Sequence, residues 1–200
     1  MSKSFFILIC GYLMCTATMT VYAQNELSVE DSSAIDRTPP KIIFIKVTLD
    51  DEDPKIRKMA LARVTDRNVF KQVALNDKDP EVRKMALAKV TDQSVLKQIA
   101  LNDTVPEIRK MALAGSTDQS MFRQIVLNDK DPGVRKMALS RLYRSTDQSV
   151  FRQIALYDED AEVRKLVLAR ITDQSVFKQI ALNDKDPEVR KLALARITDQ

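Results

Sequence analysis

A repeat of 26 residues runs through most of this 200-residue chain and constrains its fold more than any other feature. The interval between the fourth and fifth copies is three residues longer, which places an insertion at residues 142–145. A fixed period of this length predicts a repeat architecture, in which each unit packs only on its neighbours. The residues that mark the start of each copy are Pro54, Pro80, Pro106, Pro132, Ala161 and Pro187.

Each copy predicts two short helices, as the copy at residues 79–102 shows. Asp79 is the expected N-cap of the first helix, and Pro80 its first residue, where the missing N–H costs no hydrogen bond. The second helix is expected to start after a cap at Thr91 or Asp92. Helical spacing predicts buried faces made of Val82, Met85, Ala86 and Val90 in the first helix, and of Val95, Leu96, Ile99 and Ala100 in the second.

Helices of this length are marginally stable alone in water, so the pairs must stack to bury their apolar faces. The predicted fold is therefore an all-α solenoid of about six helix-turn-helix repeats. A half-copy at residues 43–50 aligns with residues 69–76 and is expected to be a capping helix. Because residues 41–49 are rich in β-branched side chains, an isolated strand is the alternative, although the repeat register favours a helix.

The first 23 residues have the pattern of a secretory signal peptide. Lys3 precedes an apolar run over residues 5–15, and Val21 and Ala23 are compact residues at the positions that signal peptidase reads. We expect cleavage after Ala23, a periplasmic or secreted protein, and no membrane association afterwards. The alternative is an uncleaved anchor. Residues 24–38 are polar and acidic and predict a disordered linker, followed by the repeat domain at 39–200.

Composition excludes most catalytic sites. The chain has no His, and both cysteines, Cys10 and Cys15, lie in the predicted signal peptide. Catalytic triads, Cys/His pairs and ordinary zinc sites are therefore excluded, and we expect no enzyme activity, cofactor or metal. Calcium on the acidic loops is a weak alternative, because the loops lack the spacing of known calcium loops. The net charge of +4 is too small for a dedicated nucleic-acid binder, although binding through Lys/Arg stripes stays an alternative.

The segment Asp-Pro-Glu-Val-Arg-Lys-Met-Ala-Leu-Ala at 79–88 resembles the second helix of HEAT repeats, especially short bacterial HEAT-like repeats. The spacing to the later Ile-Ala-Leu-Asn-Asp is also similar to variant leucine-rich repeats. The resemblance covers about residues 43–199 and implies an armadillo-like helical solenoid with a right-handed superhelix. It specifies architecture rather than function. Because some HEAT-like proteins resemble lyases, an enzyme-associated factor is an alternative function.

One arginine recurs in every copy, and we interpret this row as a structural ladder between neighbours. HEAT repeats use Asp and Arg in this way, and the expected partners are the loop aspartates Asp53, Asp79, Asp131, Asp160 and Asp186. Because Val105 replaces this aspartate in one copy, a weaker ladder is expected there. The alternative is a basic stripe that binds an anionic partner. The ladder residues are Arg57, Arg83, Arg109, Arg135, Arg164 and Arg190.

The leading functional hypothesis is an exported, non-enzymatic protein-binding or scaffold module. Basic residues recur on the polar side of the second helices, and departures from the template cluster between residues 104 and 161. A solvated face and drift after duplication are the alternatives. The candidate partner-binding residues are Tyr143, Arg144, Tyr157, Lys97, Arg123, Arg152 and Lys178. The first helix of the last copy has an apolar face made of Val189, Leu192, Ala193 and Ile197. Because this face has no evident polar cap, we expect the chain to associate with itself through its C-terminal end.

Overall fold

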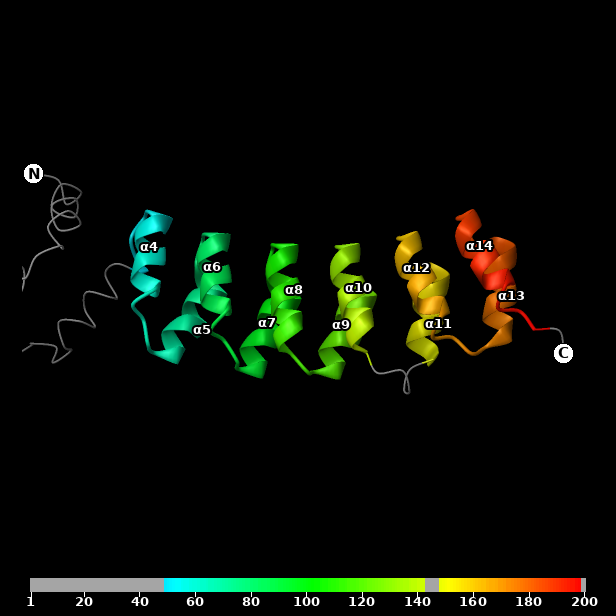
Figure 1. The fold of residues 1–200 in the computed structure, drawn as a ribbon, viewed down its shortest axis with the longest axis horizontal. Helices are drawn as coiled ribbons and strands as arrows, with labels where there is room; N and C mark the ends of the chain where they lie inside the picture. The colour runs from blue at the N-terminus through cyan, green and yellow to red at the C-terminus, as the bar shows by residue number, and fades with distance from the viewer. Residues whose placement is uncertain (1–48, 143–147, 199–200) are drawn as a thin grey trace, which may run out of the picture. The chain divides into compact units, whose positions relative to one another are not determined.

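The computed structural model describes residues 49–142 and 148–198, and all regular structure in these ranges is helical (Figure 1). They belong to the second of two units into which the chain divides, residues 44–200. The predicted signal peptide, the linker and most of the half-copy at 43–50 lie outside the described residues. In the described part, no helix is both long enough and apolar enough to cross a membrane.

Two kinds of helix alternate along the chain, as the repeat predicts. The first helices begin at the repeat proline or alanine: α4 (Pro54–Leu61), α6 (Pro80–Leu87), α8 (Pro106–Gly115), α10 (Pro132–Arg141), α12 (Ala161–Leu168) and α14 (Pro187–Leu194). The second helices lie between them: α5 (Arg67–Asn76), α7 (Gln93–Asn102), α9 (Gln119–Asn128), α11 (Gln148–Tyr157) and α13 (Gln174–Asn183). The all-α solenoid predicted from the sequence is confirmed for this unit.

Aspartate caps fix where the helices begin. The Asp79 carboxylate accepts hydrogen bonds from the backbone amides of Glu81 and Val82, both at 3.0 Å, so the predicted cap of α6 is confirmed. Asp92, rather than Thr91, caps α7. The exception among the first helices is α8, whose N-cap residue Val105 makes no side-chain hydrogen bond. These caps satisfy amides that have no partner within the helix.

The helices form two layers with the core between them. First helices pack on neighbouring first helices, and second helices pack on neighbouring second helices (Figure 1). Between the layers, each second helix packs most extensively on the first helix that follows it, as α7 does on α8. Each closely packed helical hairpin therefore consists of a second helix and the first helix that follows it in the chain. The sequence period alone does not show at which of the two kinds of helix a hairpin begins.

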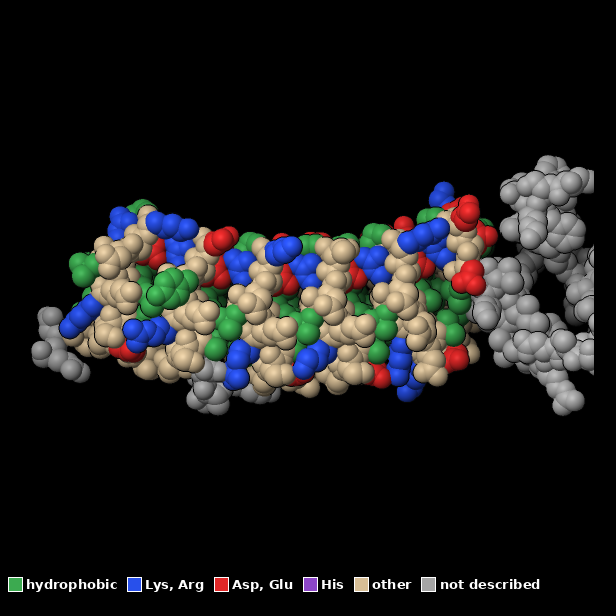
Figure 2. All heavy atoms as spheres, turned by 180° about the vertical axis from the view of Figure 1, so that it is seen from behind, with side chains coloured by type: hydrophobic (Ala, Val, Ile, Leu, Met, Phe, Trp, Pro, Cys, Tyr) green, Lys and Arg blue, Asp and Glu red, His purple; other side chains and the backbone are tan. Residues whose placement is uncertain are grey.

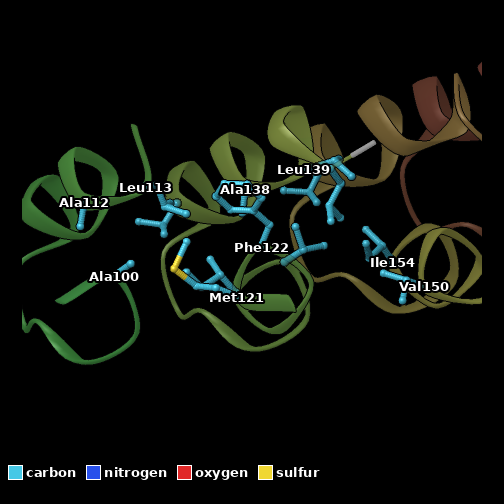
Figure 3. Packing of buried hydrophobic residues seen from close by; sticks show 14 of the residues in the cluster. Ala100, Ala112, Leu113, Met121, Phe122, Ala138, Leu139, Val150 and Ile154 are labelled. Atoms are coloured by element: carbon cyan, nitrogen blue, oxygen red, sulfur yellow. The ribbon is translucent and has the colours of Figure 1, made fainter. Parts of the chain in front are cut away.

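Apolar side chains at equivalent positions of successive repeats form the core. Figure 3 shows Leu113 and Leu139 of the first helices directed toward Met121 and Phe122 of a second helix. All four residues predicted for the face of α7 are buried. In α6 the prediction was wrong for Met85, which is 37% exposed, while Leu87 is 3% exposed and takes part in the core. The buried stripe of the first helix is therefore rotated away from Met85.

The missing cap of α8 generates a first prediction. Replacing Val105 by Asp supplies the carboxylate that starts the other first helices, and we expect it to raise the free energy of unfolding by about 1 kcal/mol. Urea denaturation followed by circular dichroism measures this. Thr104→Asp is the matched control, because it adds the same charge one residue before the cap position. Equal stabilisation by both variants would show that the charge, and not the cap, is responsible.

Candidate functional site

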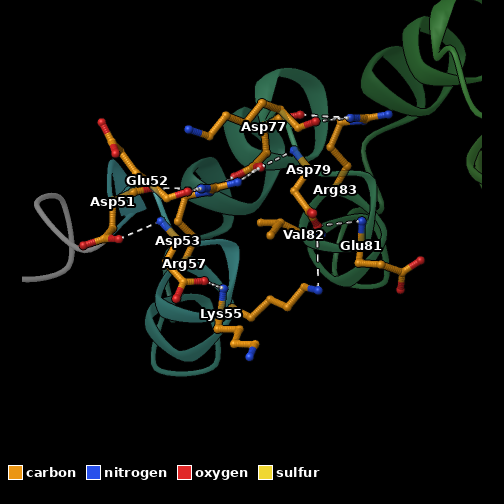
Figure 4. Close-up of polar contacts among 12 residues, drawn as sticks. Asp51, Glu52, Asp53, Lys55, Arg57, Asp77, Asp79, Glu81, Val82 and Arg83 are labelled. Atoms are coloured by element: carbon orange, nitrogen blue, oxygen red, sulfur yellow. Dashed lines mark hydrogen bonds and ion pairs between the residues drawn. The ribbon is translucent and has the colours of Figure 1, made fainter. Parts of the chain in front are cut away.

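Bidentate ion pairs between arginine and aspartate join each repeat to the next, and we name this row the Arg–Asp ladder. In Figure 4, the guanidinium of Arg57 in α4 lies against the carboxylate of Asp77, which follows α5. Its Nε and Nη2 atoms donate to the two carboxylate oxygens, both at 2.8 Å. The same two-bond geometry recurs in four further pairs: Arg83–Asp103, Arg109–Asp129, Arg135–Asp158 and Arg164–Asp184.

Further hydrogen bonds satisfy the remaining polar atoms of the ladder. Nη1 of Arg83 donates to the carbonyl oxygen of Asp77 at 3.0 Å, in the loop that precedes its own helix. One oxygen of Asp77 also accepts from the backbone amide of Asp79 at 2.8 Å. The guanidinium groups lie deep in the structure, since Arg57 and Arg164 are only 3% and 2% exposed. Each arginine therefore fixes two successive loops at once.

The ladder predicted from the sequence is present, but its predicted partners were wrong. Asp53, Asp79, Asp131, Asp160 and Asp186 cap the first helices instead. The arginines use the aspartate two residues earlier, which ends the preceding second helix. The expected weakness at Val105 is also absent from the ladder, because Arg83 pairs with Asp103 at 2.8 and 2.9 Å. In the described part of the chain, Arg190 bonds the carbonyl of Asp184 and meets no carboxylate.

The ladder shifts the pKa of Arg57, Asp77 and Asp184 in the directions that favour charge. The hydrogen bonds that Arg57 donates to the Asp77 carboxylate raise the pKa of Arg57, even though burial opposes this shift. For Asp77 itself, burial raises the pKa, but the hydrogen bonds from Arg57 and the Asp79 amide outweigh it and hold the pKa below its ordinary value. The pKa of Asp184 is lowered in the same way, with Arg164 as the donor. The pair of Arg57 and Asp77 is therefore ionised at neutral pH.

A second row of ion pairs joins the second helices, and we name it the Lys–cap row. Nζ of Lys71 lies 2.6 Å from the cap carboxylate of Asp92, and Nζ of Lys97 lies 2.8 Å from that of Asp118. These bonds, with those from the serines that follow the caps, lower the pKa of both aspartates. The Lys–cap row is more exposed than the ladder, since the side chains of Lys97 and Asp118 are 40% and 29% exposed. In Figure 2, basic and acidic side chains follow the array along its length.

A glutamine clamp in the hairpins that begin with α7, α11 and α13 was not foreseen from the sequence. Nε2 of Gln93, at the start of α7, donates to the carbonyl oxygen of Gly115 at the end of α8 at 3.1 Å. Its Oε1 accepts from the backbone amide of Thr117 at 3.1 Å. Gln148 and Gln174 bond the ends of their following first helices in the same manner. The signal was available, because Asp-Gln recurs at this point of the repeat in five copies although capping does not require the glutamine.

Arginines at the ends of three first helices make a further contact that sequence reasoning missed. Arg141, Arg170 and Arg196 lie over the rings of Phe122, Phe151 and Phe177, at 5.8–6.0 Å from the ring centroids. Such contacts are favourable between a cation and an aromatic face. In the hairpin of α7 and α8 both members of this contact differ. Leu96 stands at the position of the phenylalanine, and Gly115 stands at the position of the arginine.

The structure places that glycine in contact with the leucine. A Cβ atom at Gly115 would lie 3.2 Å from Cδ1 of Leu96, which is tighter than ordinary van der Waals contact. The two departures from the template are therefore coupled, because the smaller residue makes room for the branched one. They explain one part of the irregular region between residues 104 and 161 by packing rather than by binding.

Four of the candidate partner-binding residues occupy one equivalent position on successive second helices: Lys97 in α7, Arg123 in α9, Arg152 in α11 and Lys178 in α13. Lys97 pairs with Asp118, and Arg152 of α11 lies 3.5 Å from Asp173, so both take part in the Lys–cap row. Arg123 and Lys178 are exposed at equivalent positions of α9 and α13. Tyr157 ends α11 and is 73% exposed. The candidates at positions 143 and 144 lie outside the described residues.

Comparison with known proteins adds no functional assignment. No family model, curated protein or solved structure matches the chain. Within residues 49–142 and 148–198, no three acidic or cysteine side chains gather in a group that could hold a metal ion. Chemically, the ladder, the Lys–cap row and the glutamine clamp are contacts that hold neighbouring helices together.

The burial of the ladder generates a second prediction. Arg109→Met removes the guanidinium but keeps the aliphatic length, and leaves the Asp129 carboxylate without its main partner. We expect a loss of about 3–5 kcal/mol in the free energy of unfolding. Lys97→Met, in the more exposed Lys–cap row, is the matched control and should cost about 1 kcal/mol or less. Urea denaturation compares the two, and similar losses would show that burial does not set the strength of the ladder.

A third prediction concerns acid. Because the folded pKa of Asp77 lies below its unfolded value of about 3.9, its contribution is fully present above that value and is lost as pH falls through the folded pKa. We expect the free energy of unfolding to decrease with falling pH below about 4. Asp77→Asn removes one titrating group, so its stability should depend less on pH in this range. An unchanged slope in Asp77→Asn would contradict the assignment.

Proposed function

We propose that the chain is an exported, non-enzymatic protein-binding module, whose helical repeats present one extended surface to a partner. The observation that carries the proposal is the use of the repeated polar residues. Arginine, lysine, aspartate and glutamine at template positions bond neighbouring helices, so the most regular polar residues of the chain serve cohesion of the array. Such an array is a rigid support, and binding specificity then lies in the side chains that differ between copies.

Tyr157 is the strongest candidate for a contact with that partner. The residue ends α11, where the other second helices end with Asn76, Asn102, Asn128 and Asn183. It is 73% exposed, although a large aromatic side chain gains most from burial. Tyrosine is among the residue types that dominate binding energy at interfaces. Arg123 in α9 and Lys178 in α13 are positively charged and belong to the same layer of second helices as Tyr157.

The HEAT-like relationship and the export of the chain belong to the same proposal. The alternation of short helices in two layers, with an Arg–Asp ladder between neighbours, supports the HEAT-like type over other repeats of similar length. The sequence of residues 1–23 supports export. The small net charge of +4 favours a protein partner over a nucleic acid, which would need an extensive basic surface.

Photo-crosslinking from position 157 tests the proposal. A crosslinking amino acid at this position should capture a reproducible protein from the exported fraction of the native host, and the same amino acid at position 128 should not. Tyr157→Asn restores the template residue and is therefore a conservative change for the fold. We expect it to weaken binding of the captured protein by at least about tenfold, since the loss of a hot-spot side chain costs about 2 kcal/mol or more.

Two results would contradict this proposal. One is the absence of a reproducible partner at position 157, and the other is equal capture at positions 128 and 157. Binding of an RNA or DNA oligonucleotide with an affinity that falls steeply with salt would instead support the nucleic-acid alternative.

A further inference from the structure

The Arg–Asp ladder has an unused donor at one end of the described array and an unused acceptor at the other. Among the described first helices α4 comes first and α14 last, and each packs on the next one along the chain (Figure 1). Nη1 of Arg190 in α14 donates to the carbonyl oxygen of Asp184 at 2.7 Å, but no described carboxylate accepts from this guanidinium. Before α4, Asp51 stands at the ladder position, and no described arginine side chain pairs with its carboxylate.

The loop that contains Asp51 already makes the other bonds of a ladder loop. Oδ1 of Asp51 accepts from the backbone amide of Asp53 at 2.8 Å, and its carbonyl oxygen accepts from Nη1 of Arg57, also at 2.8 Å. Asp77 accepts the two corresponding bonds in the next loop (Figure 4). One period before Arg57 the sequence has Asp31, so the repeat pattern supplies no arginine for Asp51. What this loop lacks is the arginine of a preceding repeat.

The lysine beside each ladder arginine gives a second pair of unused groups. In three copies its ammonium lies 3.5–3.9 Å from the cap aspartate of the next first helix: Lys58–Asp79, Lys110–Asp131 and Lys136–Asp160. The equivalent lysine of α14 is Lys191, and the equivalent cap of α4 is Asp53. Neither makes an ion pair within the part of the chain that the structure describes. Two donors of α14 thus match two acceptors before α4, in the spacing that the interior pairs use.

An apolar side chain beside these donors is exposed only in α14. Leu194 is 64% exposed, although it occupies a core position. The equivalent leucines of the other described first helices are 0–3% exposed: Leu61, Leu87, Leu113, Leu139 and Leu168. Figure 3 shows Leu113 directed toward Met121 in the second helix of the following repeat. Val189 and Ala193, from which the sequence predicts self-association, are instead buried within the array. The exposed face of α14 is therefore the face that a following repeat covers elsewhere.

We propose that a second copy of this chain stacks head to tail on the exposed face of α14, through the end of its array that begins with α4. Arg190 of one copy then donates to Asp51 of the other in the two-bond geometry of the ladder, and Lys191 faces Asp53. The half-copy at 43–50 directly precedes Asp51 in the sequence, and its repeat register predicts the second helix that Leu194 requires. The junction thereby repeats the contact that joins neighbouring repeats inside the array.

Other partners would use only part of this surface. A two-fold contact between two α14 faces would oppose Arg190 to Arg190, which is unfavourable. A small anion or an acidic peptide could pair with Arg190, but it would leave the loop at Asp51 without its arginine. The five paired ladder arginines are only 2–9% exposed, and a guanidinium–carboxylate pair is strengthened by such shielding from water. A stacked second copy supplies the carboxylate and the shielding together.

Head-to-tail stacking has a consequence for the size of the assembly. The two contacting surfaces are different, so each added copy presents the same two surfaces again. Such heterologous contacts generate rings or open filaments rather than a closed dimer. We therefore expect a series of oligomers that grow with concentration. The contact does not rest on the proposed partner binding, because Tyr157 lies on α11 in the interior of the array.

Sedimentation velocity of the full chain, purified from expressing cells, tests the proposal over a range of concentrations. Arg190→Glu places a carboxylate opposite Asp51, and we expect it to weaken association by at least about tenfold. Lys130→Glu is the matched control, because it makes the same change of charge at an exposed loop residue in the interior of the array. It should leave association unchanged. Circular dichroism establishes that each variant keeps its helices.

A second pair of variants tests the apolar part of the junction. Leu194→Gln should weaken association by about tenfold, because the leucine loses the burial that stacking provides. Leu166→Gln changes a leucine that is 50% exposed on α12, away from the junction, and should have no effect. Both leucines are largely exposed in the single chain, so neither substitution opens a cavity in the core.

A charge exchange decides whether the two ends meet each other. Asp51→Arg alone should also abolish association, because it opposes two guanidinium groups. Mixing the Asp51→Arg chain with the Arg190→Glu chain should restore association. In the mixture one junction has the native pair and the next has the exchanged pair. If Asp51→Arg impairs folding of the loop, Asp51→Asn keeps an oxygen for the Asp53 amide and should still weaken association.

Four results would overturn the proposal. They are a monomer at all concentrations, association that Arg190→Glu does not weaken, association that depends on Arg190 but not on Asp51, and no restoration when the two charge variants are mixed. The third would indicate a contact between two α14 faces. Since Tyr157→Asn should leave stacking intact, and Arg190→Glu should leave crosslinking at position 157 intact, failure of one proposal is distinguishable from failure of the other.

Discussion

The bidentate pair between a first-helix arginine and the aspartate of the next loop is the interaction on which the array depends. A repeat of two short helices has no core of its own, so its stability comes from contacts with its neighbours. Apolar packing supplies most of the energy but little directional information. The guanidinium supplies direction, because its planar donors match a carboxylate in one geometry. By also bonding the carbonyl of its own loop, each arginine sets the spacing between successive loops, as Arg83 does between Asp77 and Asp103.

Much of this arrangement could be predicted from the sequence, because the template repeats the local signals of helix formation. The caps at Asp79 and Asp92, the proline at the first helical position and the buried face of α7 all follow from local rules. The existence of the Arg–Asp ladder was also predictable, since an invariant arginine in every copy needs a repeated acidic partner. The right-handed twist of the superhelix stays a prediction.

The identity of the ladder partner was not predictable, and the reason is geometric. Each loop carries two aspartates separated by one residue, such as Asp77 and Asp79, and spacing alone does not assign them. Only the residue directly before the proline can cap the first helix, so the earlier aspartate is left for the arginine. Met85 was misplaced for a similar reason. Its spacing fits the buried face, but the stripe that faces the second helices is centred on Val82 and Ala86.

The different roles of the side chains also explain which positions can vary between copies. A change at the ladder, the glutamine clamp or the core acts on two repeats at once, and it requires a compensating change, as Leu96 and Gly115 illustrate. A substitution at the last residue of a second helix acts on no neighbouring repeat. Tyr157 can therefore stand where the other second helices end with Asn. The first helices carry a methionine or leucine at one equivalent position in all six copies, and this residue is exposed in α4 (Met59) but packs against the core in α8 and α10 (Met111 and Met137). Its character is therefore kept although its burial changes from copy to copy.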